Sequence, residues 1–283
     1  MFPFKMVYKT NRNGRWNKMK RKRRRRQRKW IWGIILIIIG IRFLPTHTYM
    51  GDVSRRIESL RESLMSLGQD NFWEKNREQY PEQLIELAKK NPETRQFVKD
   101  YPEQAGKKQK IRLISSDLAG NQETDVPLFL QWDERWGYRK YGNDFMALTG
   151  CGPTCLAMVA CHTFQNDEWN PWKVAKLAEK NGYYVKGQGS AWSLMTDGAA
   201  LLGLTGTEMS CDENAIRRTL QQGHVIICAM RPGDFTTAGH FLVLAGMKDD
   251  RQVIINDPNS RKNSEKSWKL SRVVPQIKNL WKY

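Results

Sequence analysis

The feature that most restricts this chain is a block of positive charge followed directly by an apolar run near its start. Residues 1–29 contain 14 Lys or Arg and no Asp or Glu, and residues 30–41 read WIWGIILIIIGI. So many cations at the amino end of a buried helix would oppose the helix dipole, which disfavours an ordinary core helix. The order is instead typical of a signal peptide or a signal anchor whose amino end stays in the cytoplasm.

The apolar run has the length of a signal-peptide core, but residues 30–44 can form a thin span if Arg42 reaches the headgroup region. The segment that follows, Pro45-Thr46-His47-Thr48, matches a signal-peptidase site poorly. We therefore expect a basic cytoplasmic tail at 1–29 and an uncleaved anchor at 30–44, with the remaining chain outside the cell. A cleaved signal peptide and a secreted protein are the alternative.

The net charge of +18 belongs to this tail and not to the body of the chain. Residues 43–283 hold 32 Lys or Arg against 29 Asp or Glu, a net charge of +3. A nucleic-acid-binding domain would carry its excess of cations on the folded body. The sequence therefore predicts a membrane contact through residues 30–44 and no nucleic-acid partner.

Residues 45–124 read as a helical stalk or accessory region that ends in a linker. In residues 53–67 apolar side chains recur at three- and four-residue steps, which favours a helix. Tyr-Pro-Glu-Gln occurs at 80–83 and again at 101–104, and proline followed by glutamate is a helix start signal. We expect short helices at 83–90 and 94–99 that pack on the main domain, in preference to a separate binding module.

From residue 125 the chain turns to glycines, tryptophans and short β-rich runs, and it contains a Gly-Cys-Gly-Pro segment at 150–153. Gly150 and Gly152 permit a tight backbone around Cys151, and Pro153 suits the first position of a helix. Cys151 is then expected at the amino end of that helix. Free N–H groups and the helix dipole favour a thiolate there, so Cys151 is the candidate nucleophile.

The other cysteines are interpreted as structural: Cys155, Cys161, Cys211 and Cys228. No two cysteines are spaced as CxxC, which argues against a structural zinc site and against a thioredoxin-type motif. We expect neither a metal nor an organic cofactor.

A thiolate nucleophile needs an imidazole partner, and the chain has four histidines. His162 follows Cys151 by eleven residues on the same helix, about three turns away, and His47 adjoins the membrane segment. His224 and His240 each open an apolar strand, so topology alone leaves both open. The polar, glycine-rich loop before His240 is typical of a site rim and favours His240.

A third group should orient the imidazole. Residues 253–256 read as a strand antiparallel to residues 241–246, so the end of one lies beside the start of the other. This places Asp257 beside His240, with Asn256 and Asp234 as weaker candidates. Taken alone, Asp257 in Asp-Pro-Asn is as typical of a turn as of a catalytic site.

Four segments together carry a specific combination of motifs: Val126-Pro-Leu-Phe-Leu-Gln131-Trp-Asp-Glu-Arg-Trp136-Gly, Gly150-Cys-Gly-Pro-Thr154, Gly239-His-Phe-Leu-Val243 and Asn256-Asp-Pro-Asn259. They resemble the papain-like cysteine peptidases of the bacteriocin-leader, or double-glycine, peptidase type, and in particular the stand-alone, non-transporter branch. The resemblance covers residues 125–283.

The resemblance implies an α+β papain-like fold. The nucleophile helix packs on an antiparallel sheet of about five strands, preceded by the helical segment and the N-terminal membrane segment. It implies Cys151 as nucleophile, His240 as general base and Asp257 as orienting residue. Gln131 would donate to the oxyanion together with the backbone N–H of Cys151. A structural role for Gln131 in the Gln-Trp-Asp turn is the alternative, because it lies twenty residues before the cysteine.

The resulting hypothesis is a membrane-anchored cysteine peptidase that acts on peptide or protein substrates through a Cys-His-Asp triad. The same triad could serve a cell-wall amidase or a transpeptidase, and a catalytically weak peptide-binding module is a further alternative. The tryptophans, Trp192 among them, are interpreted as core or groove wall.

Overall fold

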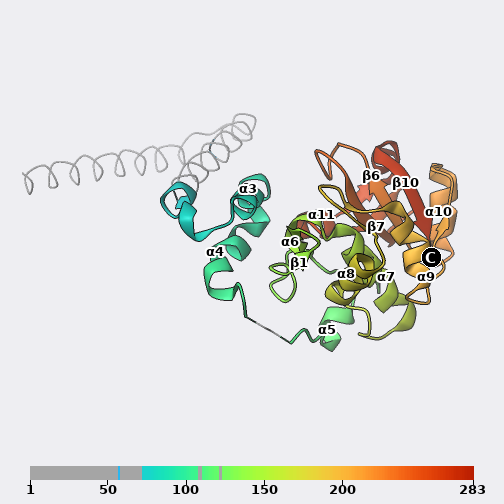
Figure 1. Ribbon diagram of the computed structural model, residues 1–283. Coiled ribbons are helices and arrows are strands. Elements are labelled where there is room, and N and C mark those ends of the chain that lie inside the picture. Colours follow the sequence, from blue (N-terminus) through green and yellow to red (C-terminus); the bar gives the residue numbers. More distant parts are fainter. Residues whose placement is uncertain (1–56, 58–71, 108–109, 121–122) are drawn as a thin grey trace, which may run out of the picture. The chain divides into compact units, whose positions relative to one another are not determined.

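The computed structural model describes residue 57 and residues 72–107, 110–120 and 123–283 (Figure 1). The chain divides into two compact units, Met1–Gln69 and Asp70–Tyr283, and the fold described below is that of the second. The predicted tail at 1–29 and anchor at 30–44 lie outside the described residues, as does the predicted helix at 53–67 apart from Ile57, which is helical. Within the described ranges, no helix combines the length and the apolar character needed to cross a bilayer.

The second unit mixes helices with one main sheet and two small hairpins. Its elements in chain order are η2 (Arg77–Gln79), α3 (Glu82–Lys90), η3 (Pro92–Thr94), α4 (Arg95–Gln104), α5 (Ser115–Leu118), β1 (Lys140–Tyr141), β2 (Asp144–Phe145), α6 (Met146–Thr149), α7 (Cys151–Phe164), α8 (Pro171–Lys180), β3 (Tyr184–Val185), β4 (Gly189–Ser190), η4 (Trp192–Met195), α9 (Asp197–Ala200), β5 (Thr207–Glu208), α10 (Glu213–Gln221), β6 (Ile226–Met230), β7 (His240–Met247), β8 (Gln252–Asn256), α11 (Arg261–Ser264), β9 (Ser267–Lys269), α12 (Leu270–Val273), η5 (Val274–Gln276) and β10 (Ile277–Lys282).

The helices α3 and α4 pack against the segment just before the nucleophile helix. The apolar residues of α3 fall on one face, and Leu84, Ile85 and Ala88 are buried. They form one cluster with residues of α4 and with Phe145 of β2. The ring of Phe97 stacks on Tyr138 at 4.2 Å between centroids, and such pairs add about 0.5–1.5 kcal/mol beyond area burial.

The second Tyr-Pro-Glu-Gln segment does not start a helix, and that prediction was wrong. Pro102 lies inside α4, in its last turn. A proline there removes one backbone hydrogen bond. The buried Phe97 and Val98, and the contact of the Tyr101 ring with Phe145 at 5.8 Å, hold the helix through this position. Tertiary packing thus outweighs the local signal. The first copy behaves as predicted, because α3 begins directly after Pro81.

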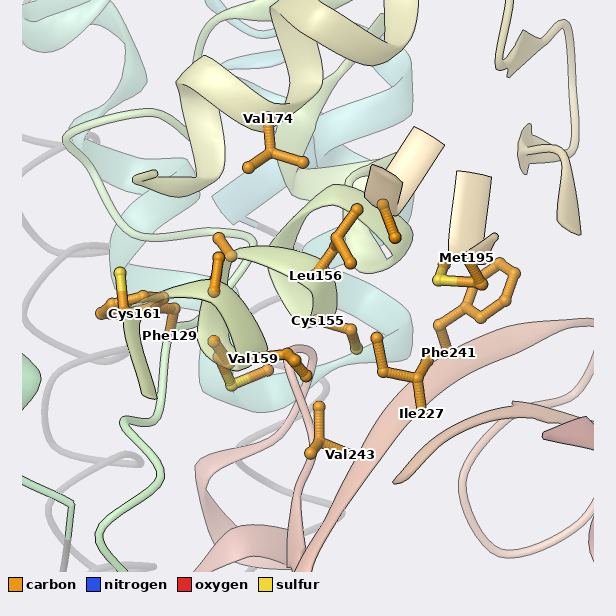
Figure 2. Close-up of a cluster of buried hydrophobic side chains, with 14 of the residues drawn as sticks. Phe129, Cys155, Leu156, Val159, Cys161, Val174, Met195, Ile227, Phe241 and Val243 are labelled. Carbon is orange, nitrogen blue, oxygen red and sulfur yellow. The ribbon is translucent and has the colours of Figure 1, made fainter. Parts of the chain in front are cut away.

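The helix α7 is the centre of the main core. Ten consecutive residues, 152–161, are buried, so the helix is covered on every side. Its side chains join Ile227 of β6 and Val243 of β7 in one cluster. Figure 2 shows this cluster, with Cys155 and Val159 of α7 beside Ile227 and Val243. Each buried Val, Leu or Met contributes about 1.5–3 kcal/mol.

The main sheet is antiparallel in every pairing, and its strand order is β5-β10-β6-β7-β8-β9. Alternate residues of β7 face opposite sides: Val243 joins the α7 cluster, whereas Leu242 and Leu244 join a second cluster. That second cluster includes Ile216 and Leu220 of α10. Because helices cover both faces, the central strands read as continuous apolar runs.

The sheet has six strands where about five were expected. The edge strands β5 and β9 are only two and three residues long, which is too short to leave a periodic pattern in the sequence. The strand expected from residue 224 begins at Ile226, and His224 is exposed rather than at a buried strand end. Its Nδ1 lies 2.7 Å from the carbonyl oxygen of Tyr283.

Candidate active site

Cys151 is the first residue of α7 and is half-buried. The helix begins two residues earlier than the position of Pro153 suggested, so Pro153 lies within the first turn. The flanking glycines are required by close packing. A Cβ at Gly150 would lie 2.5 Å from the Met146 carbonyl oxygen, and one at Gly152 would lie 2.7 Å from Ser190 Oγ. The local sequence therefore fixes Cys151 at a helix amino end, where the first N–H groups have no partner within the helix.

His240 is the first residue of β7, and its side chain contacts Asp257, the residue that follows β8. The distance from His240 Nε2 to Asp257 Oδ1 is 2.7 Å. The strands pair antiparallel with Val243 opposite Asn256, which brings the start of β7 to the end of β8. This is the juxtaposition that the strand pattern predicted.

The Asp257 carboxylate is fully buried and is surrounded by donors. Its Oδ1 accepts from the backbone N–H of Asn259 at 2.9 Å as well as from His240, and its Oδ2 accepts from Asn263 Nδ2 at 2.8 Å. An ionised carboxylate can only accept hydrogen bonds. His240 Nε2 therefore carries the proton of its bond to Asp257. The other ring nitrogen, Nδ1, is left for Cys151.

The surroundings of His240 favour its charged form. Burial by itself lowers the pKa of His240, but the charge and hydrogen bond of Asp257 raise it, and a hydrogen bond and charge interaction with Cys151 raise it further. The net result is a pKa of about 10 for His240. At neutral pH the imidazole is therefore an imidazolium, the form that stabilises a neighbouring thiolate.

Gln131 lies in the same pocket as Cys151, His240 and Asp257. Its side chain is buried, and Nε2 donates to the Ala147 carbonyl oxygen at 2.7 Å. This bond uses one of the two Nε2 hydrogens, and Oε1 has no partner among the described residues. The structure thus brings together all four residues that the sequence singled out.

The weaker candidates have other partners. Asn256 Nδ2 donates to the carbonyl oxygens of Val126 and Pro127, so it anchors the segment that leads to Gln131. Asp234 also lines the pocket, but Arg272 binds its carboxylate with two bonds of 2.7 Å and holds the pKa of Asp234 below its usual range.

Two adjoining pockets open on the candidate residues. One has a volume of about 850 Å³ and the other about 830 Å³, and both are lined by Leu148, Cys151, Gly239 and His240. Cys151 and His240 therefore line both pockets, which together are called the cleft.

The sequence did not reveal what holds Asp257 in place. Glu93 of η3 accepts hydrogen bonds at the amino end of α11 from Ser260 Oγ (2.5 Å), Arg261 N (2.9 Å) and Lys262 N (3.2 Å). Asn91 Nδ2 donates to the Asn259 carbonyl oxygen at 2.8 Å. The run Asp-Pro-Asn-Ser at 257–260 signals a helix cap, but nothing in the sequence connects it to residues more than 160 positions earlier.

The remaining cysteines lie away from the cleft lining. Cys155 and Cys228 are fully buried, and burial raises the pKa of each thiol. Cys161 is buried with its pKa raised to about 12 by burial. Cys211 is exposed, and its Sγ donates to the Val274 carbonyl oxygen at 3.7 Å. In the described part of the chain, no group of three or more His, Cys, Asp or Glu is placed to hold a metal ion.

Comparisons with known proteins identify a family and two similar solved structures. A family model described as "Peptidase_C39 like family" matches residues 123–283. The peptidase domain of Streptococcus ComA, a bi-functional ABC transporter involved in a quorum sensing pathway, is 21% identical, with a TM-score of 0.37 over 48% of this chain and 90% of that chain. A Bacillus anthracis protein assigned as a C39-like peptidase is 16% identical, with a TM-score of 0.35 over 48% and 88%. No curated protein matches.

Proposed function

The chain belongs to the Peptidase_C39 like family, and we propose that it is a cysteine peptidase in which Cys151, His240 and Asp257 form the catalytic triad. The observation that carries the proposal is the buried His240–Asp257 pair, 2.7 Å apart, beside a cysteine at a helix amino end. A raised pKa of His240, with Nε2 tied to Asp257, leaves Nδ1 to hold and transfer the proton of the thiol.

In the proposed reaction the Cys151 thiolate attacks the carbonyl carbon of a peptide bond. The oxyanion accepts hydrogen bonds from the backbone N–H of Cys151 and from the second Nε2 hydrogen of Gln131. His240 gives its proton to the leaving amine, and the C–N bond breaks. The neutral imidazole then takes a proton from water, whose oxygen attacks the thioester; the C–S bond breaks, the acid is released, and the thiolate and imidazolium are restored.

The nucleophile is tested by comparing Cys151→Ala with Cys211→Ala. The matched control removes an exposed cysteine outside the cleft. Loss of peptide hydrolysis is expected for Cys151→Ala alone. Full hydrolysis by Cys151→Ala, measured on a mixed peptide library by mass spectrometry, would remove Cys151 from the mechanism.

The second part of the proposal is that residues 30–44 anchor the peptidase in the cytoplasmic membrane, with the catalytic unit on the outer side. It is supported by the charge bias of 14 Lys or Arg in residues 1–29. The tail also attracts an anionic inner leaflet, at about 1 kcal/mol per cation near the surface. The substrate is accordingly an extracellular peptide or protein.

External protease treatment of intact, wall-stripped cells tests this orientation. The catalytic unit is expected to be digested together with a control surface protein and to be recovered in the membrane fraction before treatment. Full protection of the residues after position 52 would reverse the orientation. Recovery of soluble enzyme in the medium would indicate a cleaved signal peptide instead.

A further inference from the structure

The two halves of the cleft differ in charge. The half next to α3 has a mixed charged lining, with the carboxylates Glu82, Glu86, Asp234 and Asp257 and the cation Lys90. The other half is lined by Arg231 and Lys278 together with Trp192, and no Asp or Glu of the described residues lines it. Cys151 and His240 line both halves.

The cations of the second half are left without acidic partners. Arg231 Nε donates to the Ile277 carbonyl oxygen at 3.2 Å, which fixes the guanidinium and leaves its terminal nitrogens for a ligand. Lys278 Nζ lies 5.3 Å from the centroid of the Trp192 ring. Neither cation forms an ion pair with an Asp or Glu in the described ranges, whereas three carboxylates of the first half bind Arg77, Lys89 and Arg272.

A local irregularity of the sheet places Lys278. In the pairing of β10 with β6, Ile277 lies opposite Met230 and Asn279 lies opposite Ala229, so Lys278 is an additional residue in a β-bulge. Bulges redirect a side chain and occur often beside active sites. The backbone N–H of Arg231 donates to the Gln276 carbonyl oxygen at 2.8 Å, which ties the other cation to the segment that precedes β10.

The third member of this group is an exposed aromatic ring. Trp192 of η4 is 42% exposed, although its ring contacts the buried Trp281 edge-on at 5.9 Å. A rigid ring that is partly exposed can contact the aliphatic part of a ligand side chain while the cations bind its charged end.

We propose that Trp192, Arg231 and Lys278 form a subsite that binds a carboxylate of the substrate within a few residues of the scissile bond. The inference rests on the proposed peptidase function and adds the substrate class, an acidic peptide. An arginine and a lysine together suit a carboxylate, because the guanidinium offers two parallel N–H donors and the ammonium adds a second charge. The carboxylate can belong to an Asp or Glu side chain or to a peptide carboxyl terminus.

The subsite is tested first by cleavage of a mixed peptide library, with each terminus free or blocked. Asp or Glu is expected at one fixed position relative to the cleaved bonds, and replacement by Asn or Gln should lower kcat/KM about tenfold to a hundredfold. Enrichment only in peptides with a free carboxyl terminus would assign the subsite to that group. Cleaved bonds without any acidic preference would overturn the proposal.

Variants that each remove one positive charge test whether Arg231 and Lys278 cause the preference for acidic peptides. Arg231→Gln and Lys278→Gln are expected to abolish the preference for acidic over neutral peptides, measured as the ratio of their kcat/KM values, and the dependence of that ratio on salt. Lys266→Gln is the matched control, because Lys266 also lies over a tryptophan ring, that of Trp268 at 4.1 Å, but does not line the cleft. Equal effects of all three variants would contradict the subsite.

A binding measurement separates this proposal from the peptidase assignment. Cys151→Ala is expected to bind the acidic peptides more tightly than their Asn or Gln counterparts, as followed by fluorescence anisotropy. If the wild-type protein cleaves no peptide but this preference is present, the peptidase proposal fails and the subsite stands. If the preference is absent, the subsite fails whatever the activity.

Discussion

Replacing Asp257 with Asn tests the physical basis of the candidate site most directly. The carboxylate accepts from His240 Nε2, Asn259 N and Asn263 Nδ2 at 2.7, 2.9 and 2.8 Å. An asparagine amide must turn its NH2 group toward at least one of these donors, so at least one buried bond is replaced by repulsion. Removing one partner of a buried charged pair costs about 3–5 kcal/mol, and this is the loss expected for Asp257→Asn near pH 6.5.

The loss in the free energy of unfolding caused by Asp257→Asn should become smaller as the pH rises. The pKa of His240 is raised from 6.5 to about 10 in the folded protein. The stabilisation of the folded state that this raised pKa represents is fully present below pH 6.5 and is lost as the pH rises through 10. Asp257→Asn removes the main cause of the raised pKa. The difference in the free energy of unfolding between wild type and variant should therefore shrink from pH 6.5 to pH 10.

Urea denaturation of the full-length protein, followed by tryptophan fluorescence at several pH values, measures this difference. Asp250→Asn is the control, since Asp250 is exposed, its carboxylate contacts Gln221 at 3.4 Å, and it precedes β8 whereas Asp257 follows that strand. A difference that stays constant or grows toward pH 10 would refute the assignment of the raised pKa to Asp257.

Three further variants examine separate parts of the argument. His240→Ala should slow the alkylation of Cys151 by iodoacetamide, whereas His224→Ala, at an exposed position, should not; equal slowing by both variants would undo the choice between the histidines. Cys155→Ala should lower the free energy of unfolding by about 1 kcal/mol in urea titrations without removing hydrolysis, because a fully buried thiol is deleted. Glu93→Ala should cost about 1–2 kcal/mol as a lost helix cap and also reduce kcat, and an unchanged kcat would mean that Glu93 does not position Asp257.

The parts of this structure that local rules determine could be predicted from the sequence. The Gly-Cys-Gly-Pro segment places a cysteine at a helix amino end, and two adjacent apolar runs place the start of β7 beside the end of β8. Both inferences depend on residues within about twenty positions of one another. The contact of His240 with Asp257 follows from the pairing of β7 with β8.

The features that escaped prediction depend on contacts between distant segments. Pro102 continues a helix only because the residues before it are packed against β2 and its neighbours. The bond from Asn91 to Asn259 joins residues 168 positions apart, and no periodicity encodes such a partner. The bulge at Lys278 likewise requires knowledge of which strand lies opposite.

The place of β10 in the sheet has a consequence for biosynthesis. The strand Ile277–Lys282 is last in the chain but lies between β5 and β6, inside the sheet. While the polypeptide is being made, β6 therefore presents an unpaired edge and five apolar residues until residues 277–282 leave the ribosome. A ribosome that stalls before these codons would leave an aggregation-prone intermediate rather than a shortened enzyme.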